Sequence, residues 1–304
     1  MLKIEGPVFA IVTPFDQAGN IDFGALHQYL AFLNQSGVKN VIVNGTTGEF
    51  ASLTIEERKS VLEYCRGRFA GYIVAHVSAC AVKDCITLLE HASQYSDAAL
   101  ILPPYYYSNA TITGLQAFFE SVIGRSSLPV YLYNFPKHTN IELKPDLVSL
   151  LCEKFSHIIG LKDSSGNLDG AIQLKSANLY LQVFMGGDSM SFAVLDKGLD
   201  GSVSGAGNPV PECLVGMHKA FVAGRKDIAR EWQEIIDIWK NYRKHLDISE
   251  VAVIKAGLRA RVDGFPVYVR PPFSAPGNAD IDSVFVHITK ELIPQISKAS
   301  AIQS

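Results

Sequence analysis

The segment GLKDSSG, residues 160–166, contains a lysine whose position is unusual enough to suggest chemistry. It completes the apolar run HIIGLK, so Lys162 ends a segment that reads as a buried strand. A buried and unpaired lysine is costly and readily shifts its pKa. As a neutral amine it can attack a ketone and form a Schiff base. The alternatives are a lysine that reaches solvent or one that pairs with Asp163.

Schiff-base chemistry also needs a proton shuttle and a binding site for the substrate. Tyr133 ends the preceding apolar run, LPVYLYN, and could transfer protons with help from the hydroxyl of Thr46. The loop NGTTGE, residues 44–49, offers consecutive backbone N–H groups that suit a small carboxylate. Each feature also has a structural interpretation, because Tyr133 could be a packed aromatic and NGTTGE could be a tight turn. Their coincidence at the ends of apolar runs favours chemistry.

Short apolar runs alternate with helical patterns along the first 224 residues. The runs are continuously apolar, which is typical of parallel strands covered on both faces. Eight such units favour a TIM barrel over an open Rossmann-like sheet, whose GxGxxG cradle is absent after the first run. The predicted strands are 8–15, 38–45, 72–78, 98–104, 128–134, 157–163, 181–187 and 200–206, and the predicted helices are 22–37, 54–69, 82–95, 113–124, 145–154, 167–177 and 189–197.

The strand pattern stops after about residue 224. Residues 225–246, 249–262 and 281–299 have helical patterns, and a proline-rich connector lies before the last of them. We therefore predict an α/β fold, a (β/α)8 barrel over residues 1–224 with a C-terminal helical region over residues 225–304.

Active sites of TIM barrels lie at the C-terminal ends of the strands. The predicted strand ends carry mainly hydroxyls and glycines, together with Lys162. The segments MGGDS and GSVSGAGN could bind substrate hydroxyls through Gly186, Asp188, Ser189, Ser204 and backbone groups. His76 is predicted to be a satisfied polar group of the core.

Composition limits the function classes. The formal net charge is −3, which indicates neither nucleic acid nor an anionic membrane as a partner. We expect no membrane span, secretory signal or cofactor, and the eight histidines lack the paired spacing of metal ligands. The five scattered cysteines include no CxxC, which favours reduced thiols in a cytoplasmic protein.

Five motifs give the chain a family resemblance: GTTGE at 45–49, PYY at 104–106, YNFP at 133–136, GLKDSSG at 160–166 and GAGNP at 205–209. With this order and spacing the chain resembles the dihydrodipicolinate synthase and N-acetylneuraminate lyase superfamily of class I pyruvate aldolases. The resemblance implies that Lys162 forms the Schiff base and that Tyr133 shuttles protons. It also implies that Thr46 and Thr47 contact the tyrosine and the pyruvate carboxylate, and that Val203 offers a backbone carbonyl near the substrate.

The resemblance further implies an oligomer. In the synthases the second tyrosine of PYY reaches a neighbouring subunit's active site, and the matching residue is Tyr106. We therefore expect a homotetramer or homodimer with small-molecule substrates.

The chain departs from the synthase pattern at position 138. Synthases carry an arginine there that grips the carboxylate of aspartate semialdehyde, whereas this chain has His138. Histidine lacks the bidentate fork and is largely neutral at pH 7. PYYY and YNFP are more similar to 2-keto-3-deoxygluconate aldolases. The sequence therefore predicts a lyase that cleaves a 2-keto-3-deoxy sugar acid to pyruvate and an aldehyde. The alternatives are a dihydrodipicolinate synthase with an atypical carboxylate site and a non-catalytic keto-acid-binding protein.

Overall fold

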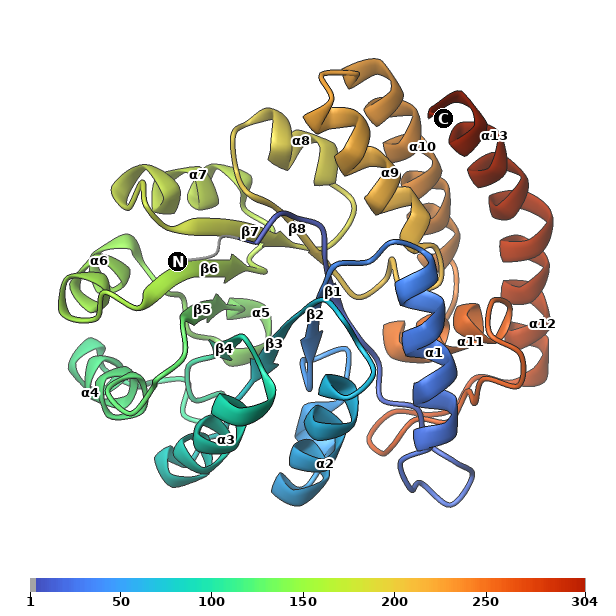
Figure 1. The fold of residues 1–304 in the computed structure, drawn as a ribbon. Helices are drawn as coiled ribbons and strands as arrows, with labels where there is room; N and C mark the ends of the chain where they lie inside the picture. The colour runs from blue at the N-terminus through green and yellow to red at the C-terminus, as the bar shows by residue number, and fades with distance from the viewer. Residues whose placement is uncertain (1–3, 304) are drawn as a thin grey trace.

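The computed structural model describes residues 4–303 and contains a closed barrel of eight parallel strands in sequence order (Figure 1). The outermost residues of the two predicted regions, 1–3 and 304, lie outside the described residues. Closure is complete because β1 pairs with both β2 and β8. The TIM barrel is confirmed, and the open Rossmann-like alternative is wrong. The strands are β1 (Val8–Ala10), β2 (Asn40–Val43), β3 (Tyr72–His76), β4 (Ala98–Ile101), β5 (Val130–Asn134), β6 (Ile158–Asp163), β7 (Gln182–Gly186) and β8 (Gly201–Ser204).

Helices surround the barrel and follow the predicted patterns closely. One example is the helix over residues 55–66, where Thr54 and Glu57 form a capping box at the N-terminus. The helices of the ring are α1 (Phe23–Gln35), α2 (Ile55–Arg66), α3 (Val82–Tyr95), α4 (Ile112–Ile123), α6 (Pro145–Lys154), α7 (Leu168–Ala177), α8 (Ser191–Asp196) and α9 (Pro211–Val222). The sequence patterns did not predict α9, nor the short α5 (Pro136–Thr139) and η1 (Phe50–Ser52).

The predicted strands extend further than the observed ones, mostly at their C-terminal ends. Strand β2, for example, ends at Val43, and the segment NGTTGE that follows it is a loop. The extra residues therefore belong to the loops that surround the barrel mouth, where active sites of this fold lie.

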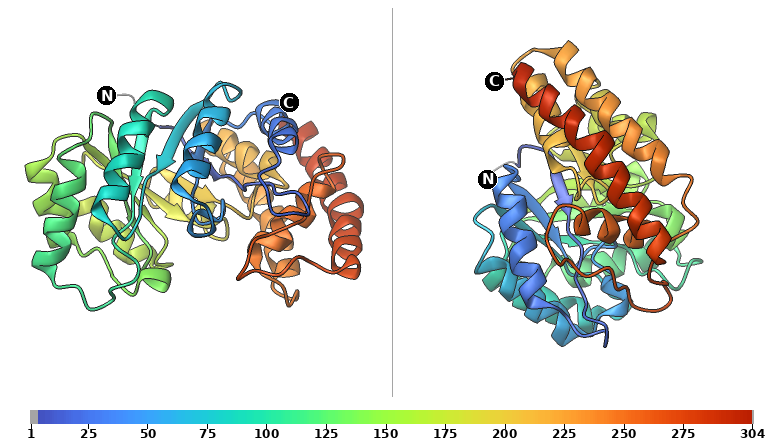
Figure 2. Two further views of the ribbon diagram at one scale, coloured as in Figure 1. Left: turned by 90° about the horizontal axis from the view of Figure 1, so that it is seen from below. Right: turned by 90° about the vertical axis from the view of Figure 1, so that its right-hand side faces the viewer.

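The C-terminal region packs on one side of the barrel. Its elements are α10 (Lys226–Arg243), α11 (Glu250–Arg259), α12 (Asn278–Val286), the π-helical turn η2 (His287–Leu292) and α13 (Ile293–Gln303). Figure 2 shows α10 and α13 lying along the outer face beside α9. The indole of Trp239 in α10 donates to the carbonyl of Ala206 (2.8 Å), which ties this region to the loop after β8. The division of the chain at residue 224 stays a prediction.

The interior of the barrel is filled by side chains and is not a channel. Inward-facing residues of the strands form one apolar cluster that includes Val8, Ile42, Leu100 and Phe184. A second and larger core lies between the strands and the helices. Among residues 4–303, no helix combines the length and apolar character that crossing a membrane would require.

Candidate active site

Lys162 is the penultimate residue of β6 and points into the barrel. Only 7% of the residue is exposed, and its stem packs among apolar side chains of the barrel interior. Its Nζ lies 4.0 Å from the centroid of the Tyr133 ring. Within residues 4–303 no carboxylate forms an ion pair with Lys162; the neighbouring Asp163 instead accepts hydrogen bonds from Asn134 (3.1 Å) and from the Ser165 backbone (2.7 Å). The solvent-exposed and Asp163-paired alternatives are therefore wrong.

Tyr133 lies directly beside Lys162, because the two residues are partners in the register of β5 and β6. The ring is buried and stacks on Phe135, with centroids 5.6 Å apart. Its hydroxyl lies 3.5 Å from the hydroxyl of Thr46, which is longer than the ordinary distance of about 2.7–2.8 Å. A small movement of Thr46 would complete this hydrogen bond.

The loop 44–49 holds Thr46 and Thr47 at the barrel mouth. Asn44 and Glu49 at its two ends both have left-handed backbone conformations, with φ of 59° and 58°. Such conformations are uncommon outside glycine, and buried contacts stabilise them here. The Asn44 side chain donates to the carbonyl of Arg58 (2.7 Å).

A glycine in the opposite loop makes room for Thr47. A Cβ atom on Gly205 would lie 2.3 Å from the hydroxyl oxygen of Thr47, so only glycine allows this approach. Gly186 at the end of β7 is similarly constrained, because a Cβ atom there would lie 2.0 Å from the Ser164 hydroxyl.

These groups surround one cavity of about 210 Å³. It brings together Lys162, Tyr133, both threonines and several other residues predicted from the sequence. The lining residues are Ala10, Thr46, Thr47, Tyr133, Phe135, His138, Lys162, Ser164, Gly186, Gly187, Asp188, Val203, Gly205, Ala206 and Glu250. A cavity of this volume suits a small ligand.

Apart from Lys162, the charged and polar side chains around the cavity carry little net positive charge. Burial, and then the charge of Lys137, lower the pKa of His138, so its ring is neutral at pH 7. Both carboxylate oxygens of Asp188 accept from Arg243 (3.1 and 3.2 Å), and the same guanidinium pairs with Glu250 (2.9 Å). Arg243 is therefore largely neutralised by two acids that line the cavity.

A second cavity adjoins the first on the side of α10. It has a volume of about 330 Å³ and shares Gly187, Asp188 and Glu250 with the first. Ser189, predicted to bind substrate hydroxyls, lines this second cavity instead. Sequence patterns did not indicate Glu250, which is the first residue of α11 and carries no local motif of its own.

Three of the predicted site residues either do not line the cavity or have their predicted group bonded elsewhere. The buried hydroxyl of Ser204 does not line the cavity and accepts from the backbone of Gly207 (2.8 Å). The carbonyl of Val203 accepts from the backbone of Gly187 (2.8 Å), while its side chain lines the cavity. Tyr106 is 77% exposed and away from the cavity. The roles assigned to these residues stay predictions.

His76 lies behind Tyr133 in the barrel, with ring centroids 6.0 Å apart. Its Nδ1 donates to the carbonyl of Asn44 (2.9 Å), while its Nε2 is buried without a hydrogen-bond partner among the described residues. The prediction of a satisfied core histidine is thus only half right. The buried guanidinium of Arg58 donates to the carbonyls of His76 (2.6 Å) and Ser78 (2.9 Å) and supports this strand end.

Known proteins are similar to this chain in fold and in sequence. Residues 3–290 match the dihydrodipicolinate synthetase family. A 4-hydroxy-tetrahydrodipicolinate synthase of Methanothrix thermoacetophila is 35% identical over 225 residues, which cover 73% of this chain and 76% of that protein. The chain is also similar to YagE, a prophage protein of E. coli solved with pyruvate (TM-score 0.87, 26% identity, 94% of this chain and 98% of that one).

A sialic acid aldolase of Ruminococcus gnavus, solved as a catalytic lysine mutant, is similar over 99% of this chain and 98% of its own, with a TM-score of 0.89 and 25% identity. The names of these proteins cover more than one substrate. The chain belongs to the dihydrodipicolinate synthetase family of class I aldolases, and it is a carbon–carbon lyase.

Proposed function

We propose that the protein reversibly cleaves a 2-keto-3-deoxy sugar acid to pyruvate and an aldehyde through a Schiff base on Lys162. The observation that carries this proposal is the buried Lys162 amine, which faces Tyr133 in a cavity and has no carboxylate partner among the described residues. The amine attacks the keto carbon, water leaves, and a protonated imine forms. Cleavage of the C3–C4 bond sends its electrons into the imine, and the C4 hydroxyl loses its proton.

Tyr133 is the group best placed to move these protons. Its ring lies against the Lys162 amine and its hydroxyl is 3.5 Å from that of Thr46, so it can take the proton from the C4 hydroxyl and return one to C3 of the enamine. Hydrolysis of the resulting imine then frees pyruvate and restores Lys162.

The loop 44–49 is the proposed site for the pyruvate carboxylate. The N–H groups of Gly48 and Glu49 are used inside the loop, on the carbonyls of Gly45 and Thr46 (both 3.0 Å). In the part of the chain that the structure describes, the N–H groups of Thr46 and Thr47 have no protein acceptor. Together with the two hydroxyls, they give a carboxylate several donors.

The other polar residues of the cavity support an uncharged polyhydroxy aldehyde as the second product. A carboxylate on the aldehyde would meet neutral His138 and the acids Asp188 and Glu250, whereas hydroxyls could donate to those acids. Lys137 is exposed and does not line the cavity.

The 35% identity to a named 4-hydroxy-tetrahydrodipicolinate synthase supports that activity as the second candidate. The two candidates differ in the aldehyde: the synthase would take aspartate semialdehyde. A non-catalytic keto-acid-binding protein is a weaker third possibility, because the lysine, the tyrosine and both threonines share one cavity.

A pyruvate-release assay across a panel of 2-keto-3-deoxy acids tests the proposal, with condensation of pyruvate with aspartate semialdehyde measured in parallel. We expect pyruvate release from at least one sugar acid, and we expect glyceraldehyde to exceed aspartate semialdehyde by at least about tenfold in kcat/KM. A preference for aspartate semialdehyde would favour the synthase. An adduct with pyruvate but no turnover of any substrate would favour the binding protein.

We further propose that the chain acts as a homo-oligomer, as the family's use of Tyr106 implies. Tyr106 and Tyr107 are both largely exposed and pack edge to face, with centroids 5.2 Å apart. Two exposed aromatic rings side by side suit a surface that another subunit covers.

A further inference from the structure

An ion pair beneath the loop 44–49 is the most completely buried charge pair in the described chain. Lys255 of α11 and Glu49 of the loop both have side chains that are 0% exposed, and Nζ lies 2.6 Å from Oε1. The two residues are 206 positions apart in the sequence. The pair therefore joins the C-terminal helical region to the loop that carries Thr46 and Thr47.

Each member of the pair has further partners that fix its position. Lys255 also donates to the carbonyl of Tyr268 (2.7 Å), and the second oxygen of Glu49 accepts from the backbone N–H of Arg270 (2.9 Å). Both cations lie close to the ring of Phe15, whose centroid is 4.3 Å from Nζ of Lys255 and 4.5 Å from the guanidinium carbon of Arg270. Burial lowers the pKa of Lys255 to about 8 while Glu49 opposes the shift, so the amine is charged at pH 7.

The guanidinium of Arg270 binds the segment that follows the loop in the sequence. It makes two hydrogen bonds to Glu57 at the start of α2 (2.5 and 2.8 Å) and donates to the carbonyl of Ser52 (2.8 Å). Lys255 of α11 and Arg270 of the connector that follows it therefore fix the segment from Glu49 to the start of α2.

Glu49 needs such support because of its backbone. A φ of 58° is unfavourable for a residue with a side chain, and its N–H donates to the carbonyl of Thr46 (3.0 Å). If the Glu49 carboxylate lost its partners, relaxation of the backbone would shift the turn that aims Thr46 and Thr47 at the cavity.

Stability alone does not explain a pair of this kind. Desolvation of both charges offsets much of their attraction, and buried ion pairs can often be replaced by apolar residues without loss of stability. An apolar pair would not fix the position of Glu49 in the same way. Its carboxylate receives directed hydrogen bonds from two segments, through Lys255 and the backbone of Arg270.

We propose that Lys255 and Glu49 are positioning residues, which hold Thr46 and Thr47 in the geometry that binds the pyruvate carboxylate. This inference rests on the proposed function, in which that carboxylate binds the loop. It assigns to the C-terminal helical region a part in recognising the keto acid, although α11 itself contributes only Glu250 to the cavity lining.

The test compares two ketones that differ in one group. Pyruvate carries the carboxylate, while pyruvamide has nearly the same shape and is neutral. The rate of adduct formation in cyanoborohydride, followed by intact mass at a series of ketone concentrations, gives a preference ratio for pyruvate over pyruvamide. Lys255→Met removes the charge and keeps most of the side-chain length, and circular dichroism checks that the variant is folded.

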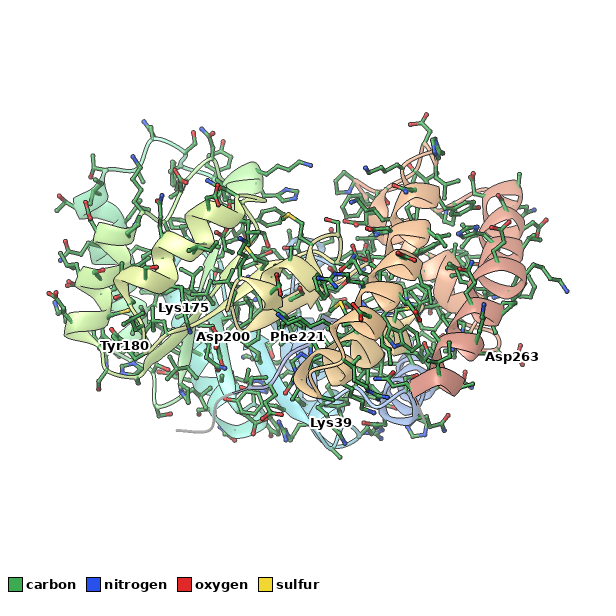
Figure 3. The ribbon with its side chains drawn as sticks, turned by 90° about the horizontal axis from the view of Figure 1, so that it is seen from above. Lys39, Lys175, Tyr180, Asp200, Phe221 and Asp263 are labelled. Carbon is green, nitrogen blue, oxygen red and sulfur yellow. The ribbon has the colours of Figure 1, made fainter. Side chains whose placement is uncertain are left out.

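Lys175→Met is the matched control. Lys175 also bonds a carboxylate and a carbonyl, Asp200 (2.8 Å) and Leu181 (2.5 Å), but at the N-terminal end of β7 and β8, away from the cavity. Figure 3 labels Lys175 and Asp200. Loss of this pair tests the effect of removing a partly buried ion pair that does not contact the loop.

We expect Lys255→Met to lower the preference ratio by about tenfold or more, through pyruvate alone, with pyruvamide changed by less than about twofold. Lys175→Met should leave the ratio unchanged. If Lys255→Met does not fold, Glu49→Gln replaces it in the test, because this change weakens the ion pair and keeps the shape of the side chain. The same fall in the preference ratio is then expected.

Equal loss with both ketones, or an unchanged ratio in a folded variant, would overturn the positioning role and leave the proposed function standing. Absence of any adduct on Lys162 in the wild-type protein would refute the proposed function, and the positioning role would fall with it.

Discussion

Replacing His138 by arginine should shift the choice of aldehyde toward aspartate semialdehyde. The side chain at this position lines the same cavity as Lys162 and is neutral at pH 7, because burial and Lys137 lower its pKa. An arginine would add a charged, bidentate donor for the carboxylate of that aldehyde. Charged hydrogen bonds of this type contribute about 1.5–3 kcal/mol.

Part of this gain would be lost to Glu250. Its carboxylate lines the same cavity and is mostly exposed, so it would compete for the new guanidinium at a cost of about 0–1 kcal/mol. The remaining gain of about 0.5–3 kcal/mol corresponds to an increase of about 2- to 150-fold in kcat/KM for aspartate semialdehyde. The rate with glyceraldehyde should change little.

The assay measures initial rates of condensation with pyruvate for both aldehydes in wild type, His138→Arg and His138→Gln. The glutamine variant is the control, because it stays neutral and should leave the preference near that of wild type. A wild-type protein that already prefers aspartate semialdehyde would refute the reasoning. Lys137 would then be the residue that replaces the missing arginine, and Lys137→Ala should abolish the preference.

Other consequences of the structure can be measured separately. Tyr133→Phe removes only the hydroxyl, so we expect turnover to fall by about 10²- to 10⁴-fold with slower adduct formation and an intact fold; a loss within about threefold would exclude Tyr133 as the proton shuttle. Sedimentation at assay concentration should show a homo-oligomer that covers Tyr106, a tetramer rather than a dimer, and a fully active monomer would contradict this. Hydrogen bonds from Arg270 lower the pKa of Glu57 to about 2. This pair therefore stabilises the fold fully above pH 4.5, and its contribution is lost as the pH falls toward 2. Accordingly, Glu57→Gln should be less stable than wild type at pH 7 and lose less stability between pH 4.5 and 2; parallel curves of unfolding free energy against pH would be the contrary result.

The barrel was predictable because its signal is local. Continuous apolar runs separated by helical patterns indicate parallel strands, and the order of the strands in a closed barrel then follows from the order in the sequence. The same reasoning predicted that Lys162 and Tyr133 lie on neighbouring strands, and in the structure they are register partners. The helix α9 was missed because it begins at Pro211, directly after a proline-containing loop, where the pattern resembled a continued loop.

The rest of the site depends on contacts between distant segments. Glu250 and Lys255 belong to a helix that carries no motif, and their importance appears only when α11 packs beneath the loop 44–49. The hydroxyl of Ser204 illustrates the opposite case. A serine at a strand end was expected to face the substrate. Its hydroxyl oxygen instead accepts a hydrogen bond from the backbone N–H of Gly207 in the turn that follows β8.

Mapping the adduct that pyruvate forms with the wild-type protein tests the central claim most directly. Incubation with pyruvate and a hydride donor should add one reduced pyruvyl group per chain, and peptide mass analysis should place it on Lys162. The proposed mechanism also requires that Lys162→Ala forms no adduct and has no turnover. Attachment to another lysine, or undiminished activity in Lys162→Ala, would contradict the account.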